Sequence, residues 1–88
     1  MPGASRDNDS AGGDLIPSQS TVKINNELVI VDGDGVAGHG DFPHIPQTIS
    51  ASINSTVKIG NKSIVVAGDT ADICGDVATG SPDVNIAG

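Results

Sequence analysis

The chain has 88 residues, 36% of them apolar, and a net charge of −7 from 11 acidic and 4 basic side chains. A domain this small buries only about 60% of the surface of its unfolded chain, which argues against a deep enzyme cleft. Because Phe42 is the only aromatic residue and cations are scarce, there is neither a basic surface for phosphates nor a platform for stacking bases. Nucleic acid is therefore excluded as a partner.

Short strands and tight turns are expected along the whole chain. Residues 22–24 alternate apolar and polar side chains, Asn25 and Asn26 suit a tight turn, and an apolar run follows at residues 28–31. Residues 57–59, 60–61 and 64–67 repeat this order, which predicts a second hairpin whose second strand is again the more buried one. Gly-Asp pairs at 33–34 and 68–69 should end these second strands. Since no stretch shows a 3.6-residue apolar period, we predict an all-β fold with little or no helix.

The chain also repeats itself at an offset of about 35 residues. The sequence Ser-Thr-Val-Lys-Ile occurs at 20–24 and again at 55–59, and the register continues into the following strands. A third, partial copy lies at 82–86, and residues 4–9 can be aligned with 29–34 and 64–69 to supply its missing half. We therefore predict one domain, residues 1–88, with pseudo-threefold symmetry and with loops at 32–46 and 68–82 between the repeated units.

Three residues can bind a transition metal, and all lie in the loops after the second strands. His39 and Cys74 occupy equivalent repeat positions, and His44 follows five residues after His39. Around a threefold axis these loops would meet at one end, where two imidazoles and a thiolate would form a Zn²⁺ or Fe²⁺ site that lacks one ligand. The simpler alternative is two surface histidines and a buried thiol. Since Cys74 is the only cysteine, it has no partner for an intramolecular disulfide, which fits synthesis in a reducing compartment.

Other chemistry is less well supported. Residues 32–35, Asp-Gly-Asp-Gly, lack the later ligands of a twelve-residue calcium loop and are better explained as turns. Cys74 could act as a nucleophile with either histidine as its base, but the chain is too small and too poor in aromatic residues to form a substrate pocket. The aspartates are interpreted as solvated loop carboxylates, namely Asp7, Asp9, Asp14 and Asp76.

The sequence indicates no membrane segment. The apolar runs at 28–31 and 64–67 are far shorter than the roughly 20 residues that a spanning helix needs. The first residues lack the apolar region of a secretory signal, so we expect synthesis in the cytoplasm without a signal peptide. The net charge of −7 should also disfavour stable insertion into an anionic bilayer.

Several motifs resemble the PAAR-repeat family, which is named for a proline-alanine-alanine-arginine motif. Residues 2–6, Pro-Gly-Ala-Ser-Arg, stand where that motif is expected, and Ala11-Gly12-Gly13 stands at the His-Gly-Gly of the family. His44, followed by Thr48 and Ile49, resembles the second His-Gly stretch. The most specific matches are Cys74-Gly75 and the final ten residues, which are similar to a closing G-S-P-x-V-x-I-x-G motif.

This resemblance implies a small pyramid of hairpins that caps the blunt end of a trimeric β-helical spike, with one monomer per trimer. Such tips sharpen a contractile injection machine, either a phage tail in the virion or a type VI secretion apparatus, and are not enzymes. The family's metal, most simply Zn²⁺ with Fe²⁺ as the second choice, would be bound at the apex by His39, His44 and Cys74. The base that contacts the spike would be formed by the first strands, through Val22, Ile24, Val57, Ile59, Val84 and Ile86.

Ala11 stands where the family has a further ligand histidine. Asp14, a water molecule or an altered geometry could complete the site. The competing hypothesis is a small metal-dependent hydrolase or a free metal-binding module, for which a solvent-open metal would be needed. Tethering of separate effectors to the tip is compatible with the capping role.

Overall fold

Eight short strands form the computed structural model, which describes residues 3–54 and 56–86; within these residues there is no helix, so the all-β prediction is confirmed. Consequently, no helix in these ranges is long or apolar enough to cross a membrane. A four-stranded antiparallel sheet has the order β1-β2-β5-β6, and β3-β4 and β7-β8 are separate hairpins. The strands are β1 (Ser10–Ala11), β2 (Gly13–Ile16), β3 (Lys23–Ile24), β4 (Glu27–Leu28), β5 (Gly35–Val36), β6 (Gln47–Thr48), β7 (Lys58–Ile59) and β8 (Lys62–Ser63).

The two predicted hairpins are confirmed, with their turns at the expected residues. Lys23 pairs with Leu28 in the first hairpin, and Lys58 pairs with Ser63 in the second. Both turns need two residues with positive φ, which matches the mirror-image turns that suit twisted hairpins. The φ angles are 54° and 65° at Asn25 and Asn26, and 58° and 66° at Gly60 and Asn61.

A ring of three backbone hydrogen bonds confirms the pseudo-threefold arrangement. The N–H of Ser5 donates to the carbonyl of Val65 at 2.9 Å, that of Ile30 to Ser5 at 3.0 Å, and that of Val65 to Ile30 at 2.9 Å. We call these three residues the three-way ring. All three residues are fully buried, so water cannot reach their backbone N–H and carbonyl groups. The ring supplies the hydrogen-bond partners that these groups need. The N-terminal segment therefore completes the third unit, as predicted.

Three equivalent aspartates brace this ring. The carboxylates of Asp9, Asp34 and Asp69 each accept a hydrogen bond from the backbone N–H three residues earlier, at 2.9, 2.8 and 2.9 Å. Asp69 is completely buried and also accepts from the N–H groups of Ser52 and Ile53. The expectation that Asp9 is a solvated loop carboxylate is wrong: it is only 7% exposed, because it pairs with the guanidinium of Arg6 at 2.9 Å and replaces solvent with that contact.

Two apolar clusters fill the interior. The larger cluster lies under the four-stranded sheet and consists of Ala11, Leu15, Ile30, Val36, Ile49, Val65, Ala71 and Ala78. The smaller one, here called the basal cluster, consists of Ala4, Val29, Ile64 and Val66. β5 and β6 supply Val36 and its neighbour Gln47, so part of the loop predicted at 32–46 is strand. Gly35, the first residue of β5, pairs with both Ile16 and Thr48, so β5 lies in the middle of the sheet.

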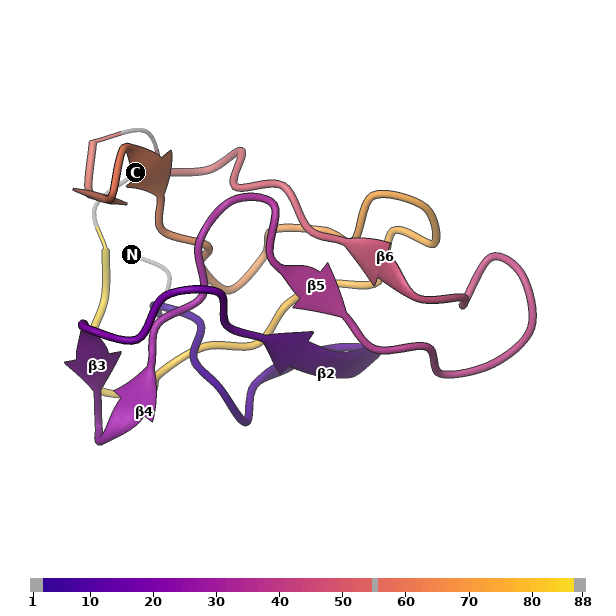
Figure 1. Ribbon diagram of the computed structural model, residues 1–88, viewed down its shortest axis with the longest axis horizontal. Helices are drawn as coiled ribbons and strands as arrows, with labels where there is room; N and C mark the ends of the chain where they lie inside the picture. The colour runs from indigo at the N-terminus through magenta and orange to yellow at the C-terminus, as the bar shows by residue number, and fades with distance from the viewer. Residues whose placement is uncertain (1–2, 55, 87–88) are drawn as a thin grey trace.

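The principal extents of the molecule are 33 × 24 × 23 Å. Figure 1 shows the hairpins β3–β4 and β7–β8 at one end, which we call the basal end, and the loops around β5 and β6 at the other. At the basal end Val22 and Val57 are 39% and 40% exposed. Three equivalent isoleucines pack on the basal cluster and are partly buried, namely Ile24, Ile59 and Ile86. Val84 is partly buried as well.

Candidate metal centre

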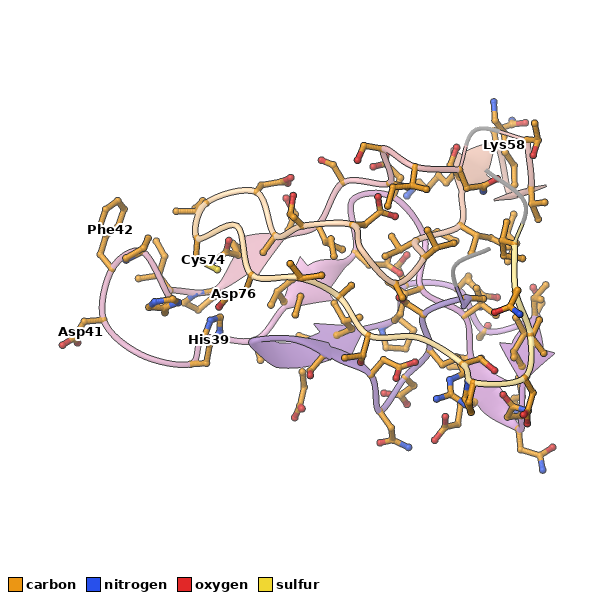
Figure 2. The ribbon with its side chains drawn as sticks, turned by 180° about the vertical axis from the view of Figure 1, so that it is seen from behind. His39, Asp41, Phe42, Lys58, Cys74 and Asp76 are labelled. Atoms are coloured by element: carbon orange, nitrogen blue, oxygen red, sulfur yellow. The ribbon has the colours of Figure 1, made fainter. Side chains whose placement is uncertain are left out.

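Four side chains meet at the end opposite the basal hairpins, and we call them the ligand cluster: His39, His44, Cys74 and Asp76. One potential ligand atom from each lies within 4.8 Å of those of the others. Figure 2 shows His39, Cys74 and Asp76 close together at this end, with Asp41 and Phe42 on the loop beyond them and Lys58 at the far end. The three residues that the sequence singled out are thus brought together, along with one that it did not.

His39 is oriented by its own loop. Its Nδ1 lies 3.0 Å from the carbonyl oxygen of Ala37, which can only accept, so Nδ1 carries the proton and donates it. Its Nε2 then faces the rest of the cluster. A ring nitrogen fixed by a backbone carbonyl is the usual support of a histidine that binds metal through its other nitrogen.

His44 returns to the cluster through a tight loop. The N–H of His44 donates to the carbonyl of Asp41 at 2.7 Å, and the N–H of His39 donates to the carbonyl of His44 at 2.9 Å, so that the loop closes on itself. This places Nδ1 of His44 3.0 Å from Nε2 of His39 and 3.3 Å from Oδ2 of Asp76. The imidazole of His44 is 41% exposed, compared with 16% for the side chain of His39 and 35% for that of Asp76.

Cys74 and Asp76 project from one turn. Gly75 between them has a φ of 74°, a conformation that glycine adopts without steric cost. The N–H of Gly75 and the carbonyl of Asp76 are both hydrogen-bonded to Ala71, at 3.1 and 3.0 Å. As a result, Sγ of Cys74 lies 3.8 Å from Nε2 of His39, and Oδ2 of Asp76 lies 2.8 Å from the same nitrogen.

Gln47 ties the histidine loop to the cysteine turn, although nothing in the sequence marked it as a candidate. Its Oε1 accepts from the N–H groups of Ile73 and Cys74 at 2.7 and 2.9 Å. Its Nε2 donates to the carbonyls of Pro43 and Ile45 at 3.0 and 2.9 Å. Gln47 is only 9% exposed, so these four bonds replace its contacts with water and hold the two ligand-bearing segments in register.

The β1–β2 turn closes over the cluster. A methyl group added at Gly12 would overlap Oδ2 of Asp76 and would lie 2.6 Å from Nε2 of His39. A methyl group at Gly13 would lie 2.7 Å from Nδ1 of His39. The glycines therefore allow the backbone to lie directly against the ligand atoms.

The charges of the cluster are coupled. The hydrogen bond to the carbonyl of Ala37, followed by that to Asp76, raises the pKa of His39 above its usual value. The hydrogen bond from His39, followed by that from Cys74, lowers the pKa of Asp76. Without a metal, the cluster therefore favours a protonated imidazole beside an ionised carboxylate. A metal ion would take the place of this proton, because imidazole binds metal in its neutral form.

The donor set fits a metal ion. In a tetrahedral Zn²⁺ site, bonds of about 2.0–2.3 Å place neighbouring ligand atoms about 3.3–3.6 Å apart. Four of the six separations here are 2.8, 3.0, 3.3 and 3.8 Å, and none of the six exceeds 4.8 Å, so the side chains would have to shift to reach this geometry. The ligand cluster could therefore hold a metal ion between two nitrogens, a sulfur and an oxygen.

Asp76 corrects two sequence expectations. The sequence predicts a solvated loop carboxylate at this position, but Asp76 is hydrogen-bonded to His39 inside the cluster. Asp14, considered as the missing ligand, is exposed on β2 and does not belong to the cluster, and Ala11 is fully buried in the larger core cluster. The signal that could have identified Asp76 is its position two residues after Cys74 on a glycine turn.

No family model matches the chain, and no curated protein is significantly similar to it.

Proposed function

We propose that this protein is a structural, non-enzymatic tip that caps a trimeric β-helical spike of a contractile injection machine, with one monomer on each trimer. The observation that carries the proposal is the three-way ring, which gives a single chain three similar faces around one axis. A trimeric β-helix ends in three equivalent sets of unpaired strand edges, which favour aggregation unless they are covered. A pseudo-threefold monomer can cover all three at once by strand addition and apolar contact.

The basal end offers the surface for that contact. Val22 and Val57 are exposed at equivalent repeat positions, and Val84 occupies the third position. Beneath them, Ile24, Ile59 and Ile86 pack on the basal cluster, so that the apolar surface has a rigid support. An apolar centre of this kind matches the buried core of a protein interface.

The ligand cluster would stabilise the opposite end. We assign it to one Zn²⁺, bound by His39, His44, Cys74 and Asp76, with Fe²⁺ as the second choice. A thiolate and two imidazoles favour Zn²⁺ among the common divalent ions. Four protein ligands would leave no open position for a substrate, which favours a structural metal over the hydrolase alternative. The loops of this end have few apolar contacts, so a metal would supply the cross-links that a small core lacks.

The capping role is tested by mixing the protein with a purified trimeric β-helical spike fragment and measuring the mass of the complex by size-exclusion chromatography with light scattering. We expect one monomer per trimer. The double variant Val57→Asp/Val84→Asp should lose this complex, because charge would be buried unpaired in a dry interface. Ile16→Asp is the matched control, since Ile16 is 52% exposed but lies on β2, outside the basal hairpins. Equal binding by the folded double variant would show that the base is not the contact surface.

The metal is tested separately by elemental analysis and by Co²⁺ substitution. We expect about one zinc per chain, and a Co²⁺ spectrum with the strong ligand-field bands of four-coordinate geometry and a thiolate charge-transfer band. A six-coordinate spectrum without the thiolate band would contradict the assignment, and an open site would revive the hydrolase hypothesis.

A further inference from the structure

The lysines are confined to the basal hairpins. Lys23 lies on β3, Lys58 on β7 and Lys62 on β8, and all three are exposed. Figure 2 shows Lys58 at the end opposite the ligand cluster. The segments that build the cluster end, residues 35–49 and 70–79, contain three aspartates and neither lysine nor arginine. The three lysines therefore all lie at the base, where Glu27 on β4 and the exposed Asp83 also lie.

Two of these lysines are equivalent by the repeat. Lys23 and Lys58 are each the middle residue of a Val-Lys-Ile segment. Because Ile24 and Ile59 pack inward on the basal cluster, the alternation of side chains turns both lysines outward to solvent. Neither forms an ion pair with a carboxylate of residues 3–54 or 56–86. The third unit has Val-Asn-Ile at this place, and Asn85 is exposed there. The apolar base is thus bordered by two cations and one neutral amide at three corresponding positions.

We propose that Lys23 and Lys58 recognise the same acidic residue on two neighbouring subunits of the trimeric partner; this inference rests on the proposed capping function. In a trimer, a carboxylate that faces one arm of the base is repeated in front of the other two. A carboxylate opposite Lys23 would therefore also stand opposite Lys58 and Asn85. The partner surface is accordingly an apolar centre with a rim that bears one Asp or Glu per subunit, and the third of these carboxylates meets no cation on the tip.

Charge complementarity of this kind acts mainly on encounter and orientation. The basal lysines would be attracted to the acidic rim, whereas the aspartates Asp41, Asp72 and Asp76 at the other end would be repelled by it. The protein would therefore approach the spike with its base first. Since both basal lysines are exposed, each pair should be screened by salt and should contribute modestly to affinity.

The test uses the same trimeric spike fragment and measures affinity and association rate by surface plasmon resonance at low and high salt. Lys23→Met and Lys58→Met should each weaken binding by about 1.5- to 5-fold at low salt, the range of an exposed ion pair, with a smaller effect at high salt. Asn85→Lys should tighten binding by a similar factor, because it supplies the missing third cation. Lys62→Met is the control for net charge: its repeat position holds Glu27, so no threefold partner contact is expected for it.

The outcomes separate this inference from the function on which it rests. If the unaltered protein forms no complex with the trimer, the capping function fails and this inference fails with it. If the complex forms but Asn85→Lys does not tighten it, or Lys62→Met weakens it as much as Lys23→Met, the rim of equivalent carboxylates is refuted while capping stands.

Discussion

Gly12→Ala offers a sharp test of the metal centre, because the chain contains a matched control. Gly12 and Gly33 have nearly the same φ angle, 84° and 87°. An alanine in this left-handed region costs about 1–2 kcal/mol at either position. Their surroundings differ: a methyl group at Gly33 would meet no atom within 4 Å, whereas one at Gly12 would overlap Asp76 and His39.

Without metal, both variants should therefore lose a similar amount of unfolding free energy because of the backbone strain. In a domain of this size, each kcal/mol lost lowers Tm by about 4–8 °C. Only Gly12→Ala should also displace the ligand atoms. A disturbed ligand support lowers metal affinity by roughly 10–100-fold. At saturating zinc, that loss removes about 1.4–2.7 kcal/mol of the stabilisation that the metal provides.

The assay is a competition titration of zinc against a chromophoric chelator, combined with thermal unfolding with and without zinc. Gly33→Ala should keep the zinc affinity and the zinc-dependent rise in Tm of the unaltered protein, and Gly12→Ala should lose a large part of both. If the two variants bind zinc equally well, the β1–β2 turn does not lie against the metal ligands and the assigned centre is wrong.

Three further outcomes are expected. Cys74→Ala should lose the stoichiometric metal and several degrees of Tm, as metal affinity is coupled to folding in small domains; elemental analysis of the folded variant decides this, and a retained metal would remove Cys74 from the ligand set. In the metal-free protein, the raised pKa of His39 contributes stability below its usual 6.5 that is lost as pH rises through the raised value, and the lowered pKa of Asp76 contributes stability that is lost as pH falls below 3.8. Above neutral pH, the Tm of His39→Gln should therefore fall less steeply with pH than the Tm of the unaltered protein. If the two curves of Tm against pH are parallel, the interaction between His39 and Asp76 does not stabilise the protein. Finally, the isolated protein should leave dye-loaded anionic vesicles intact because of its charge of −7, and leakage at micromolar protein would show a membrane activity of its own.

The repeated hairpins could be predicted because their signals are local. Asn25-Asn26 and Gly60-Asn61 supply two positive φ angles in a row, and alternating residues flank them. The register of the repeat then aligns residues 4–9 with the two buried strands, so the pseudo-threefold arrangement could be predicted without any knowledge of long-range contacts. The same alignment predicts that His39 and Cys74 lie at the same end of the domain.

The fourth member of the cluster could not be predicted in this way. Asp76 and Asp41 follow a glycine at the same repeat position, so the repeat treats them alike. In the structure Asp41 is exposed on the longer histidine loop, whereas Asp76 is turned toward His39. The difference comes from Gln47, whose amide joins the two loops by contacts 26 and 27 residues apart in the chain. Such contacts depend on tertiary structure and leave no local pattern.

The three-way ring also has a consequence for synthesis on the ribosome. The N–H of Ser5 can form its hydrogen bond only after Val65 has been synthesised. The hydroxyl group of Ser5 donates to the carbonyl of Thr79, which is 74 residues further along the chain. Contacts of this range require large loops to close before they contribute stability, which slows folding. The nascent N-terminal segment therefore emerges with unpaired edges that only the last part of the chain can satisfy. We expect ribosome-bound chains that end before residue 65 to remain sensitive to protease along their whole length, and protection to develop in one late step.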